Sequence, residues 1–343
     1  MPTHNRPHFL RRLFRFYEQV KPGFPFFVVD SSDPPQAQQN RLVIKEVGRS
    51  QRSLQIEYQH FDLDLVNKCA RALSRLSSPH VVLCADDDFL IPDTVQVCSR
   101  FLQDHPDYST AQGLTTIARH AGTHVTQRLT TSYAIRHDDA LSRCRRLASC
   151  WFSNFYAVSR THDLAEMFQL TAAHFDWSRS FIFPEQFLSQ MSVLRGKVHV
   201  HPVVSSVWQR HPDNTSLGPK VADRSCVHTL YSEFRDHLVA EMTPRGVDRA
   251  TAVAFVDRAF IELCETDEVV RKKQQTTFRR MQRFLHRTSR QVRNVLLHEG
   301  VVRPRALRPC DTQVVSRDFE LAIQMIARYP DGIEHLTKNA SAA

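Results

Sequence analysis

Blocks of apolar residues separated by polar loops run along the first half of the chain, and their spacing changes from block to block. Residues 8–20 repeat apolar side chains at a helical period, and a Pro-Gly pair predicts the end of that helix. The other expected elements of this half are short buried strands at 24–29, 42–44 and 81–84, and helices at 62–76 and 92–102. This alternation predicts a mostly parallel sheet covered by helices.

The pattern changes in the second half. Short alternating segments at residues 108–128 predict antiparallel strands added to the sheet. The remaining expected elements are strands at 152–158 and 198–208 and helices at 161–170 and 184–195. Beyond about residue 218 the apolar residues recur only at a helical period. We therefore expect an α/β domain over residues 1–217 and a helical C-terminal region over residues 218–343.

Three consecutive carboxylates, Asp86, Asp87 and Asp88, follow the apolar run at 81–84. Like charges repel unless a cation shares them, and carboxylate oxygens suit Mg²⁺ or Mn²⁺ bound together with substrate phosphates. In open α/β sheets, ligands bind beyond the carboxyl ends of the strands, where this triplet is expected. The alternative is an acidic turn that only begins the next helix.

The sequence around this triplet resembles a known enzyme family. Pro-Thr-His-Asn-Arg at residues 2–6, Val-Val-Asp-Ser-Ser at 28–32 and Ala-Asp-Asp-Asp-Phe at 85–89 occur in the order found in family-2-like glycosyltransferases of GT-A fold. A small bacterial group of these enzymes carries the last motif. The resemblance covers roughly residues 2–215. It implies a mixed, mostly parallel sheet with flanking helices, ahead of the helical C-terminal region.

The resemblance also implies an activity. Such an enzyme moves a sugar, with inversion, from a nucleotide-diphosphate donor to an acceptor, and it uses Mn²⁺ or Mg²⁺. A UDP-sugar is the expected donor, and a glycan, a lipid-linked molecule or another cell-envelope component is the expected acceptor. The residues that match the holders of base and ribose are Thr3, His4 and Asp30.

Asp86 and Asp88 match the Asp-x-Asp pair that contacts ribose and metal, although either Asp87 or Asp88 could be the direct ligand. Lys68, in the preceding helix, could contact phosphate or could be a solvated helix lysine.

Inverting transfer also needs a general base for the acceptor hydroxyl and positive charge for the leaving diphosphate. Glu185 is the candidate base because it lies in a helical first turn beside apolar residues that could raise its pKa. The alternative is an acid that only interacts with the helix dipole. Asp176 is the second candidate base, and Arg210 is the candidate for stabilising the leaving group.

One departure from the family pattern concerns the first strand. Members have a full strand before the Pro-Thr-x-Asn-Arg sequence, whereas here Met1 directly precedes Pro2. Either the start lies about ten residues too late or the central strand is missing, and we expect a misplaced start or a truncated chain. A missing central strand would leave a gap in the sheet with unpaired backbone groups.

The net charge of +9 can be traced to one stretch, because residues 271–293 hold nine Lys and Arg and no Asp or Glu. Apolar residues at helical spacing make it a basic amphipathic helix. It could be a solvated face or a contact for anionic membrane or a lipid-linked acceptor. Nucleic-acid binding is not expected, because no recognised module accompanies the charge.

From the remaining features we expect a cytoplasmic protein, with peripheral contact at the inner face of the membrane as the alternative. No apolar run approaches the ~20 residues that span a bilayer, and the N-terminus lacks the apolar core of a signal peptide. The eight cysteines form no Cys-x-x-Cys pair, so we expect reduced thiols. His199 and His201 alone do not make a zinc site.

Two rival functions stay open. A nucleotidyltransferase also binds phosphates through Mg²⁺, but the chain has only nine glycines and no glycine-rich phosphate loop. A non-catalytic binding or scaffold protein on a degenerate GT-A fold is the rival from another class.

Overall fold

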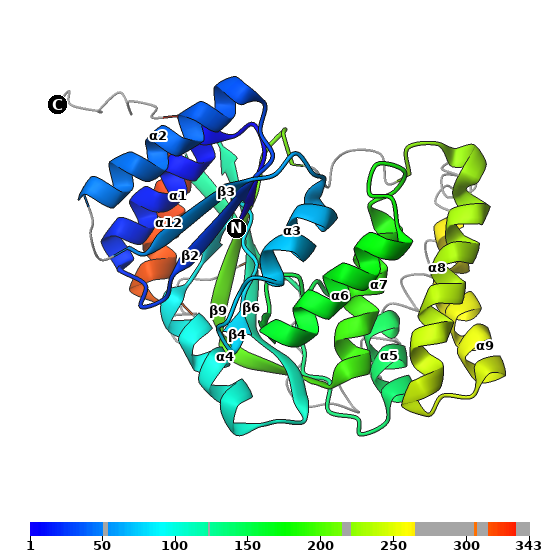
Figure 1. Ribbon diagram of the computed structural model, residues 1–343. Coiled ribbons are helices and arrows are strands. Elements are labelled where there is room, and N and C mark those ends of the chain that lie inside the picture. Colours follow the sequence, from blue (N-terminus) through cyan, green and yellow to red (C-terminus); the bar gives the residue numbers. More distant parts are fainter. Residues whose placement is uncertain (51–53, 123, 215–220, 265–304, 307–314, 334–343) are drawn as a thin grey trace.

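The computed structural model describes residues 1–50, 54–122, 124–214, 221–264, 305–306 and 315–333 (Figure 1). A sheet in two parts forms the centre, with helices on both faces and a group of helices on one flank. The basic stretch at 271–293 lies outside the described residues.

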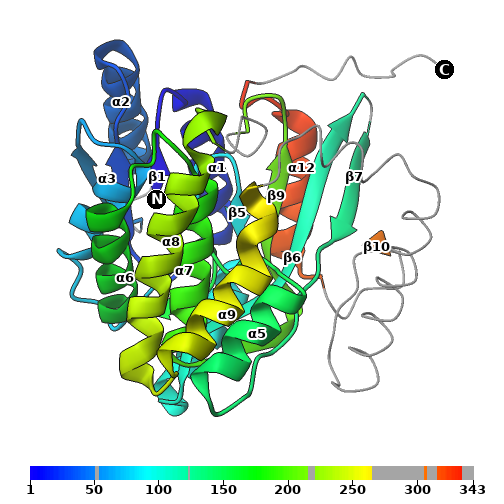
Figure 2. The same ribbon diagram turned by 90° about the vertical axis from the view of Figure 1, so that its right-hand side faces the viewer.

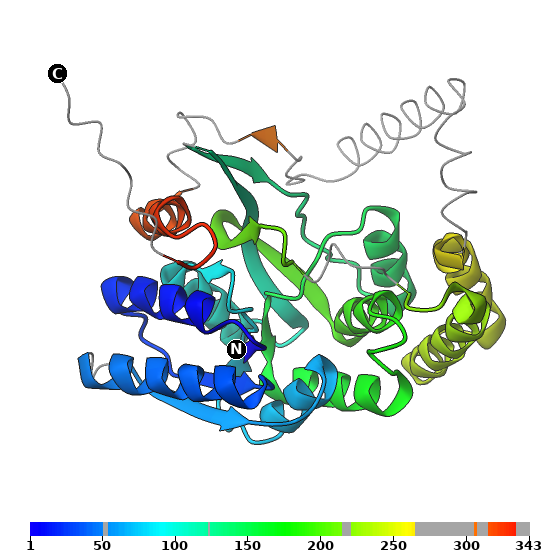
Figure 3. The same ribbon diagram turned by 90° about the horizontal axis from the view of Figure 1, so that it is seen from above.

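The first part of the sheet holds three parallel strands in the order β1-β2-β3. Their bounds are β1 (Pro2–Thr3), β2 (Phe26–Asp30) and β3 (Ile56–His60). Two helices, α1 (Pro7–Val20) and α2 (Pro34–Ser50), connect these strands and lie side by side over them (Figures 1 and 3). Thr3 pairs with Asp30, so both polar residues stand at the carboxyl edge of this part.

The strand predicted at 42–44 is wrong, because these residues lie inside α2. Val43 and Val47, one helical turn apart, are buried, whereas Leu42 is 56% exposed. A three-residue apolar run is too short to distinguish a strand from one buried turn of helix.

The second part of the sheet is mixed. Its long strands β6 (Tyr108–Ala121) and β9 (Lys197–Arg210) run parallel, and its other pairs are antiparallel. The other strands are β4 (His80–Val81), β5 (Phe89–Leu90), β7 (His124–Leu129), β8 (Val158–Arg160) and β10 (Arg305–Ala306). The antiparallel addition predicted for 108–128 is confirmed as the β6–β7 hairpin. The strand predicted at 152–158 begins only at Val158.

Helices cover this part and extend it on one flank. The bounds are α3 (Leu65–Leu73), α4 (Pro92–Asp104), α5 (Ala140–Ser149), α6 (Thr161–His174), α7 (Ile182–Arg195), α8 (Val227–Met242) and α9 (Arg249–Phe260). Figure 2 shows α5, α7, α8 and α9 together as one helical layer. A single apolar core runs from α3 through α7 to α9. Cys84 and Cys98 are buried free thiols, consistent with the reduced cysteines expected.

The last described helix, α12 (Arg317–Arg328), lies on the opposite flank from α8 and α9 and packs against α1 (Figures 1 and 3). Its residues Phe319 and Ile326 belong to the core formed by α1, β2 and α4. Residues beyond 218 therefore contribute to both flanks. Among the described residues no helix is both long enough and apolar enough to cross a bilayer.

Candidate functional site

The three aspartates form a turn between β4 and β5 at the carboxyl edge of the parallel strands. The strand before them is shorter than predicted, because β4 ends at Val81 and residues 82–85 belong to no strand. At the other end of the turn, β5 pairs with the end of β9. The Thr3 hydroxyl, at the end of β1, donates a hydrogen bond to Asp86 Oδ2 at 2.6 Å. The turn is thus held between the two parts of the sheet.

Asp87 lies at the centre of a cluster of donors. Its Oδ2 atom accepts hydrogen bonds from Arg6 Nη1 at 3.0 Å and Asn214 Nδ2 at 3.2 Å, and it lies 2.8 Å from His211 Nε2. The Arg6 guanidinium is also 3.5 Å from Asp86 Oδ1. One arginine therefore bridges two carboxylates at the mouth of the site.

Asp88 has a different environment. Its Oδ2 accepts from the Tyr156 hydroxyl at 2.6 Å and its Oδ1 from the Gln209 backbone N–H at 2.8 Å. Both oxygens are thus bound by protein groups in a buried position. Asp88 ties the acidic turn to β9.

The three carboxyl groups differ in how readily they ionise. Burial, reinforced by the charge of Asp87, raises the pKa of Asp86 to about 6. Burial and Asp87 likewise raise the pKa of Asp88 well above its ordinary value. Burial opposes ionisation of Asp87 too, but the hydrogen bond from His211 and the charge of Arg6 outweigh it and lower its pKa. Asp87 therefore ionises most readily of the three carboxyl groups.

Lys68 is buried beneath the site, so the alternative of a solvated helix lysine is wrong. Its Nζ donates to the Thr3 carbonyl oxygen at 2.7 Å and to Ser31 Oγ at 2.8 Å, and burial lowers its pKa. Lys68 therefore places a positive charge where β1 and β2 end.

Asp30 and His4 stand beside these strand ends. The Asp30 carboxylate accepts from Ser32 N–H at 2.8 Å, Asn40 Nδ2 at 2.9 Å and Tyr58 hydroxyl at 2.6 Å. Burial alone would raise the pKa of Asp30, but these hydrogen bonds lower it overall. His4 is exposed, and its Nδ1 lies 2.8 Å from the Ser31 carbonyl oxygen.

The candidate bases lie in α7 and in the loop that precedes it. Glu185 is half-buried in the first turn of α7, as predicted from sequence. Asp176 is exposed and accepts from Ser178 N–H at 2.9 Å and Ser178 Oγ at 2.6 Å, bonds that lower its pKa. Asp176 thus has a structural function in the turn before α7. Arg210 is half-buried as the last residue of β9, next to His211.

Arg6, Tyr156, His211 and Asn214 bind the acidic turn but were missed by the sequence analysis. Arg12 was missed as well, and its Nη2 donates to the Asp87 carbonyl oxygen at 2.6 Å. Signals existed for three of them, because Arg6 ends the Pro-Thr-x-Asn-Arg sequence, His211 follows the last predicted strand, and Arg12 shares a helix face with Phe9 and Phe16. Nothing in the local sequence marks Tyr156, which precedes β8.

Within the described residues, no group of three or more His, Cys, Asp and Glu side chains is arranged to hold a metal ion by itself. A cation in the acidic turn would therefore need further ligands, such as water, backbone oxygens or substrate phosphates.

No protein-family model matches this sequence, and no curated protein matches it. Among solved structures, the fold is similar to S. aureus TarS 1–349, with a TM-score of 0.51 at 15% identity over 76% of this chain and 70% of that one. The same fragment in complex with UDP gives a TM-score of 0.50 at 14% identity, with the same two coverages. The chain spans 42% of the longer TarS structure that it also matches. At such identities the similarity establishes the fold alone, and that fold is the GT-A fold expected from the sequence.

Proposed function

We propose that the protein is a metal-dependent, inverting glycosyltransferase. It transfers a sugar from a nucleotide-diphosphate donor, a UDP-sugar, to a glycan, a lipid-linked molecule or another cell-envelope acceptor. The observation that carries this proposal is the acidic turn at the carboxyl edge of the parallel strands, with Thr3, Arg6, Lys68 and His211 around it. The UDP bound to a protein of similar fold supports the choice of donor.

The site offers both positive charge and polar groups to a nucleotide-sugar. Arg6 and Lys68 provide positive charge for a diphosphate, and the buried Thr3 hydroxyl and exposed His4 lie at the strand ends proposed for base and ribose. Asp30 already accepts three hydrogen bonds from the protein. Its proposed contact with the nucleotide would therefore use a carboxylate that is already held in place.

Asp87 is the carboxylate that we propose for Mn²⁺ or Mg²⁺. Its Oδ2 accepts hydrogen bonds from Arg6 and Asn214 and lies 2.8 Å from His211 Nε2, so a cation would take the place of these donors and complete its shell with phosphates and water. Asp88 fits less well because both of its oxygens are bound by buried protein groups. When bound, the metal would add positive charge beside the diphosphate.

The reaction forms a bond between the acceptor oxygen and the anomeric carbon, and it breaks the bond from that carbon to the diphosphate oxygen. Glu185 takes the proton of the acceptor hydroxyl as this bond forms. It is preferred to Asp176, whose hydrogen bonds from Ser178 lower its pKa and weaken it as a base. Arg6 and Arg210 stabilise the negative charge on the departing UDP.

Thermal unfolding with UDP, in the presence and absence of Mn²⁺, tests donor and metal together. We expect UDP to raise Tm more when Mn²⁺ is present. Asp87→Asn should remove the metal-dependent part, while the exposed control Asp104→Asn should keep it. If UDP and Mn²⁺ leave Tm of the unaltered chain unchanged, the transferase proposal loses its main support.

Glu185→Gln separates binding from chemistry. This variant should bind UDP and Mn²⁺ as the unaltered chain does, but release of UDP from UDP-sugars should fall about 100-fold or more, as expected on loss of a general base. Normal UDP release by the variant would assign the base to another residue.

The second candidate function is a non-catalytic binding protein on the same fold. One observation favours it: the Arg6 guanidinium already bridges Asp86 and Asp87, where a cation would be needed. UDP binding that is independent of Mn²⁺, without release of UDP from any UDP-sugar, would support this alternative.

Membrane contact through residues 271–293 stays a prediction, because this stretch lies outside the described residues. Flotation with anionic vesicles at low and high salt tests it, since attraction to surface charge must weaken as salt screens it.

A further inference from the structure

The β6–β7 hairpin has an apolar face and a basic face. Ala118, Leu129 and the half-buried Val125 belong to the core that contains α12, which lies along one side of the hairpin (Figure 2). Because side chains alternate along a strand, the residues between them point to the opposite face. On β6 and β7 these residues include Arg119 and Arg128, whose side chains are both exposed.

Strand register brings three arginines together on the basic face. Arg119 of β6 pairs directly with Arg210 of β9, and Arg128 of β7 pairs with Ile117, two residues before Arg119. Neighbouring strands lie about 4.8 Å apart, so the three arginines arise from a strip roughly 10 Å wide. Like charges at directly neighbouring positions of a sheet repel each other and destabilise it.

Little in this part of the chain offsets that repulsion. Residues 108–137 contain three Arg and no Asp or Glu. Within the part of the chain that the structure describes, neither Arg119 nor Arg128 forms an ion pair. A bound anion would therefore relieve the repulsion between the arginines.

The arginine strip, which consists of Arg119, Arg128 and Arg210, is continuous with the candidate site. Trp208 lies on the same face of β9 as Arg210, and its ring meets the ring of Tyr156 edge-on, with the centroids 5.6 Å apart. The Tyr156 hydroxyl in turn donates to Asp88 at 2.6 Å. A run of side-chain contacts thus leads from the acidic turn to the strip.

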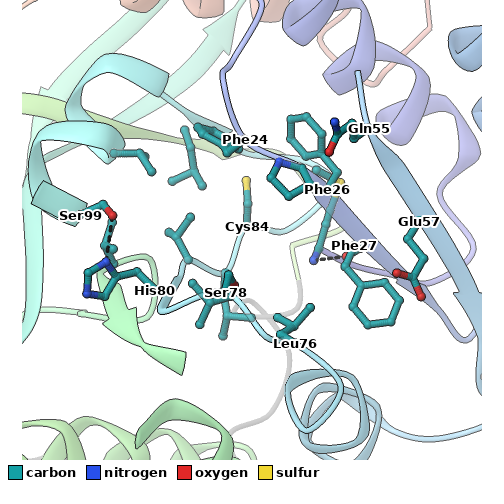
Figure 4. Close-up of a pocket in the computed structure, with 18 of the residues that line it drawn as sticks. Phe24, Phe26, Phe27, Gln55, Glu57, Leu76, Ser78, His80, Cys84 and Ser99 are labelled. Carbon is teal, nitrogen blue, oxygen red and sulfur yellow. Dashed lines mark hydrogen bonds between the residues drawn. The ribbon is translucent and has the colours of Figure 1, made fainter. Parts of the chain in front are cut away.

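The cavity on the other side of Cys84, just before the acidic turn, is a poorer match for an anion. It has a volume of about 910 Å³, and most of the side chains that line it are apolar, among them Phe24, Phe26 and Cys84 (Figure 4). None of the three arginines of the strip lines it. An anionic molecule that reaches the acidic turn is therefore better stabilised along the basic face of the sheet.

We propose that the arginine strip binds the acceptor through phosphate or carboxylate groups that the acceptor carries. This assignment rests on the transferase function proposed above. The diphosphate of the donor accounts for Arg210, but β6 and β7 lie one and two strands farther than β9 from the acidic turn. Arg119 and Arg128 are thus left for a second anionic molecule, which is the acceptor.

A membrane surface is a poorer partner for the same strip. Binding to a membrane surface normally buries large apolar side chains as well as pairing charges. The large apolar side chains that are exposed among the described residues all lie outside β6, β7 and β9; they are Leu42, Trp151, Ile261 and Ile333.

The test measures binding of anionic oligomers to the full chain by calorimetry. An oligogalacturonate supplies carboxylates, inorganic polyphosphate of similar length supplies phosphates, and a neutral glucose oligomer of similar length is the control. We expect an anionic oligomer to bind and the neutral one not to bind, and the tighter of the two anions identifies the group. No binding of either anion at millimolar concentration would overturn the proposal.

Two double variants locate the binding. Arg119→Gln with Arg128→Gln should raise Kd of the anionic oligomer about tenfold, because two charge-assisted contacts are lost. Arg249→Gln with Arg258→Gln removes the same charge from exposed positions of α9 and should change Kd less than about twofold. Both variants have the same net charge and keep the basic stretch at 271–293, so equal Kd values would assign the binding to overall charge and overturn the proposal.

Stability provides a second measurement on the same variants. Loss of Arg119 and Arg128 removes repulsion, so this variant should melt at the temperature of the unaltered chain or above it at low salt. A clearly lower Tm would show that the two arginines hold the fold together, which contradicts an anion-binding role.

The last measurement distinguishes the acceptor from other anions. An acceptor binds beside the donor, so saturating UDP and Mn²⁺ should not weaken binding of the anionic oligomer. Competition by UDP would assign the strip to the donor, and weaker flotation with anionic vesicles for the Arg119 and Arg128 variant alone would assign it to a membrane; either result overturns the proposal. Because oligomer binding requires no sugar transfer, failure of the strip is distinguished from failure of the transferase function.

Discussion

Arg12 shows how a single buried charge can organise the site. Its side chain is buried in the middle of α1, and burial lowers its pKa to about 10, so it stays charged at neutral pH. Its Nη2 donates to the Asp87 carbonyl oxygen at 2.6 Å and its Nη1 to the Tyr329 carbonyl oxygen at 3.0 Å, and it also bonds Gln209. One guanidinium thus joins the acidic turn, the end of β9 and the residue after α12.

We predict that Arg12→Met destabilises the fold by about 3 kcal/mol, because three buried acceptors lose their donor. The matched control is Arg11→Met on the same helix. The Arg11 side chain is 48% exposed and pairs with Glu46 at 3.7 Å, so its loss should cost less than about 1 kcal/mol. Urea unfolding of both variants measures the difference, and equal midpoints would contradict this account of Arg12.

His199 gives the fold a dependence on pH. Its ring stacks on Phe101 at a centroid distance of 3.8 Å. Burial, aided by the nearby His201, Arg136 and His105, lowers its pKa to about 4. The unfolded chain binds a proton at this residue near pH 6.5, but the folded chain does so only near pH 4. Stability from this group is therefore complete above pH 6.5 and is lost as pH falls toward 4.

The expected loss across this window is about 1 to 2 kcal/mol, because solvent partly screens the half-buried ring. His199→Phe should keep the stack and flatten the dependence of Tm on pH between 6.5 and 4. The exposed hairpin variant His124→Gln should leave it unchanged. An identical pH profile for His199→Phe would mean that other groups cause the acid sensitivity.

For single residues, the sequence predicted the reactive side chains that stand together in a short motif. It missed the distant residues whose contacts hold that motif in place. The acidic triplet and Thr3 were predicted and lie together. Tyr156 could not be predicted, because its contact with Asp88 joins residues 68 positions apart. Whether Asp87 or Asp88 is better placed for a cation also depends on tertiary contacts, which local sequence does not contain.

Among the elements, the β6–β9 pair depends on close approach of backbones at Gly113. A Cβ atom added there would contact the Val203 carbonyl oxygen and would lie 2.8 Å from Ser205 Cβ and 2.9 Å from Thr94 Cγ2. The register of the two strands shifts on either side of this position, and α4 packs onto it through Thr94. The absence of a side chain lets the helix and the two strands meet.

We predict that Gly113→Ala destabilises the protein by about 2 kcal/mol or more, because neighbouring backbone cannot move as a side chain can. Gly48→Ala in α2 is the matched control. Its Cβ would have nothing within 4 Å, and alanine is the better helix former, so stability should rise by about 0.5 to 1 kcal/mol. Thermal unfolding of both variants measures these opposite changes in stability. An unchanged stability of Gly113→Ala would contradict the packing argument.

The errors in the predicted strands share one physical cause, which is that an apolar run does not by itself determine secondary structure. Residues 42–44 were assigned to a strand because a short apolar run fits both a strand and a helix turn. Of the run at residues 81–84, only Leu83 and Cys84 are buried, and it forms a strand only at Val81, where β8 pairs with it. Apolar pattern predicts burial, whereas strand length also depends on a neighbour that the local sequence does not specify.

In the molecule as a whole, α12 completes the core formed by α1, β2 and α4, although it lies near the other end of the sequence. Its N-cap Ser316 accepts a hydrogen bond from Phe319 N–H at 3.3 Å, and its inner face buries Phe319, Met325 and Ile326, followed by Tyr329. These side chains pack into the core shared with α1 and α4. Because Tyr329 also accepts the hydrogen bond from Arg12, the end of α12 is linked to the acidic turn.

We predict that a chain ending at Val315 does not fold cooperatively. Burying a large apolar side chain contributes about 1.5 to 3 kcal/mol, so the four lost with α12 amount to roughly 6 to 12 kcal/mol, comparable with the total stability of a typical protein. A chain ending at Ile333 keeps all four and should melt like the full chain. Circular dichroism melting and gel filtration compare the two. A single sharp transition at an unchanged temperature for the shorter chain would show that the core is complete without α12.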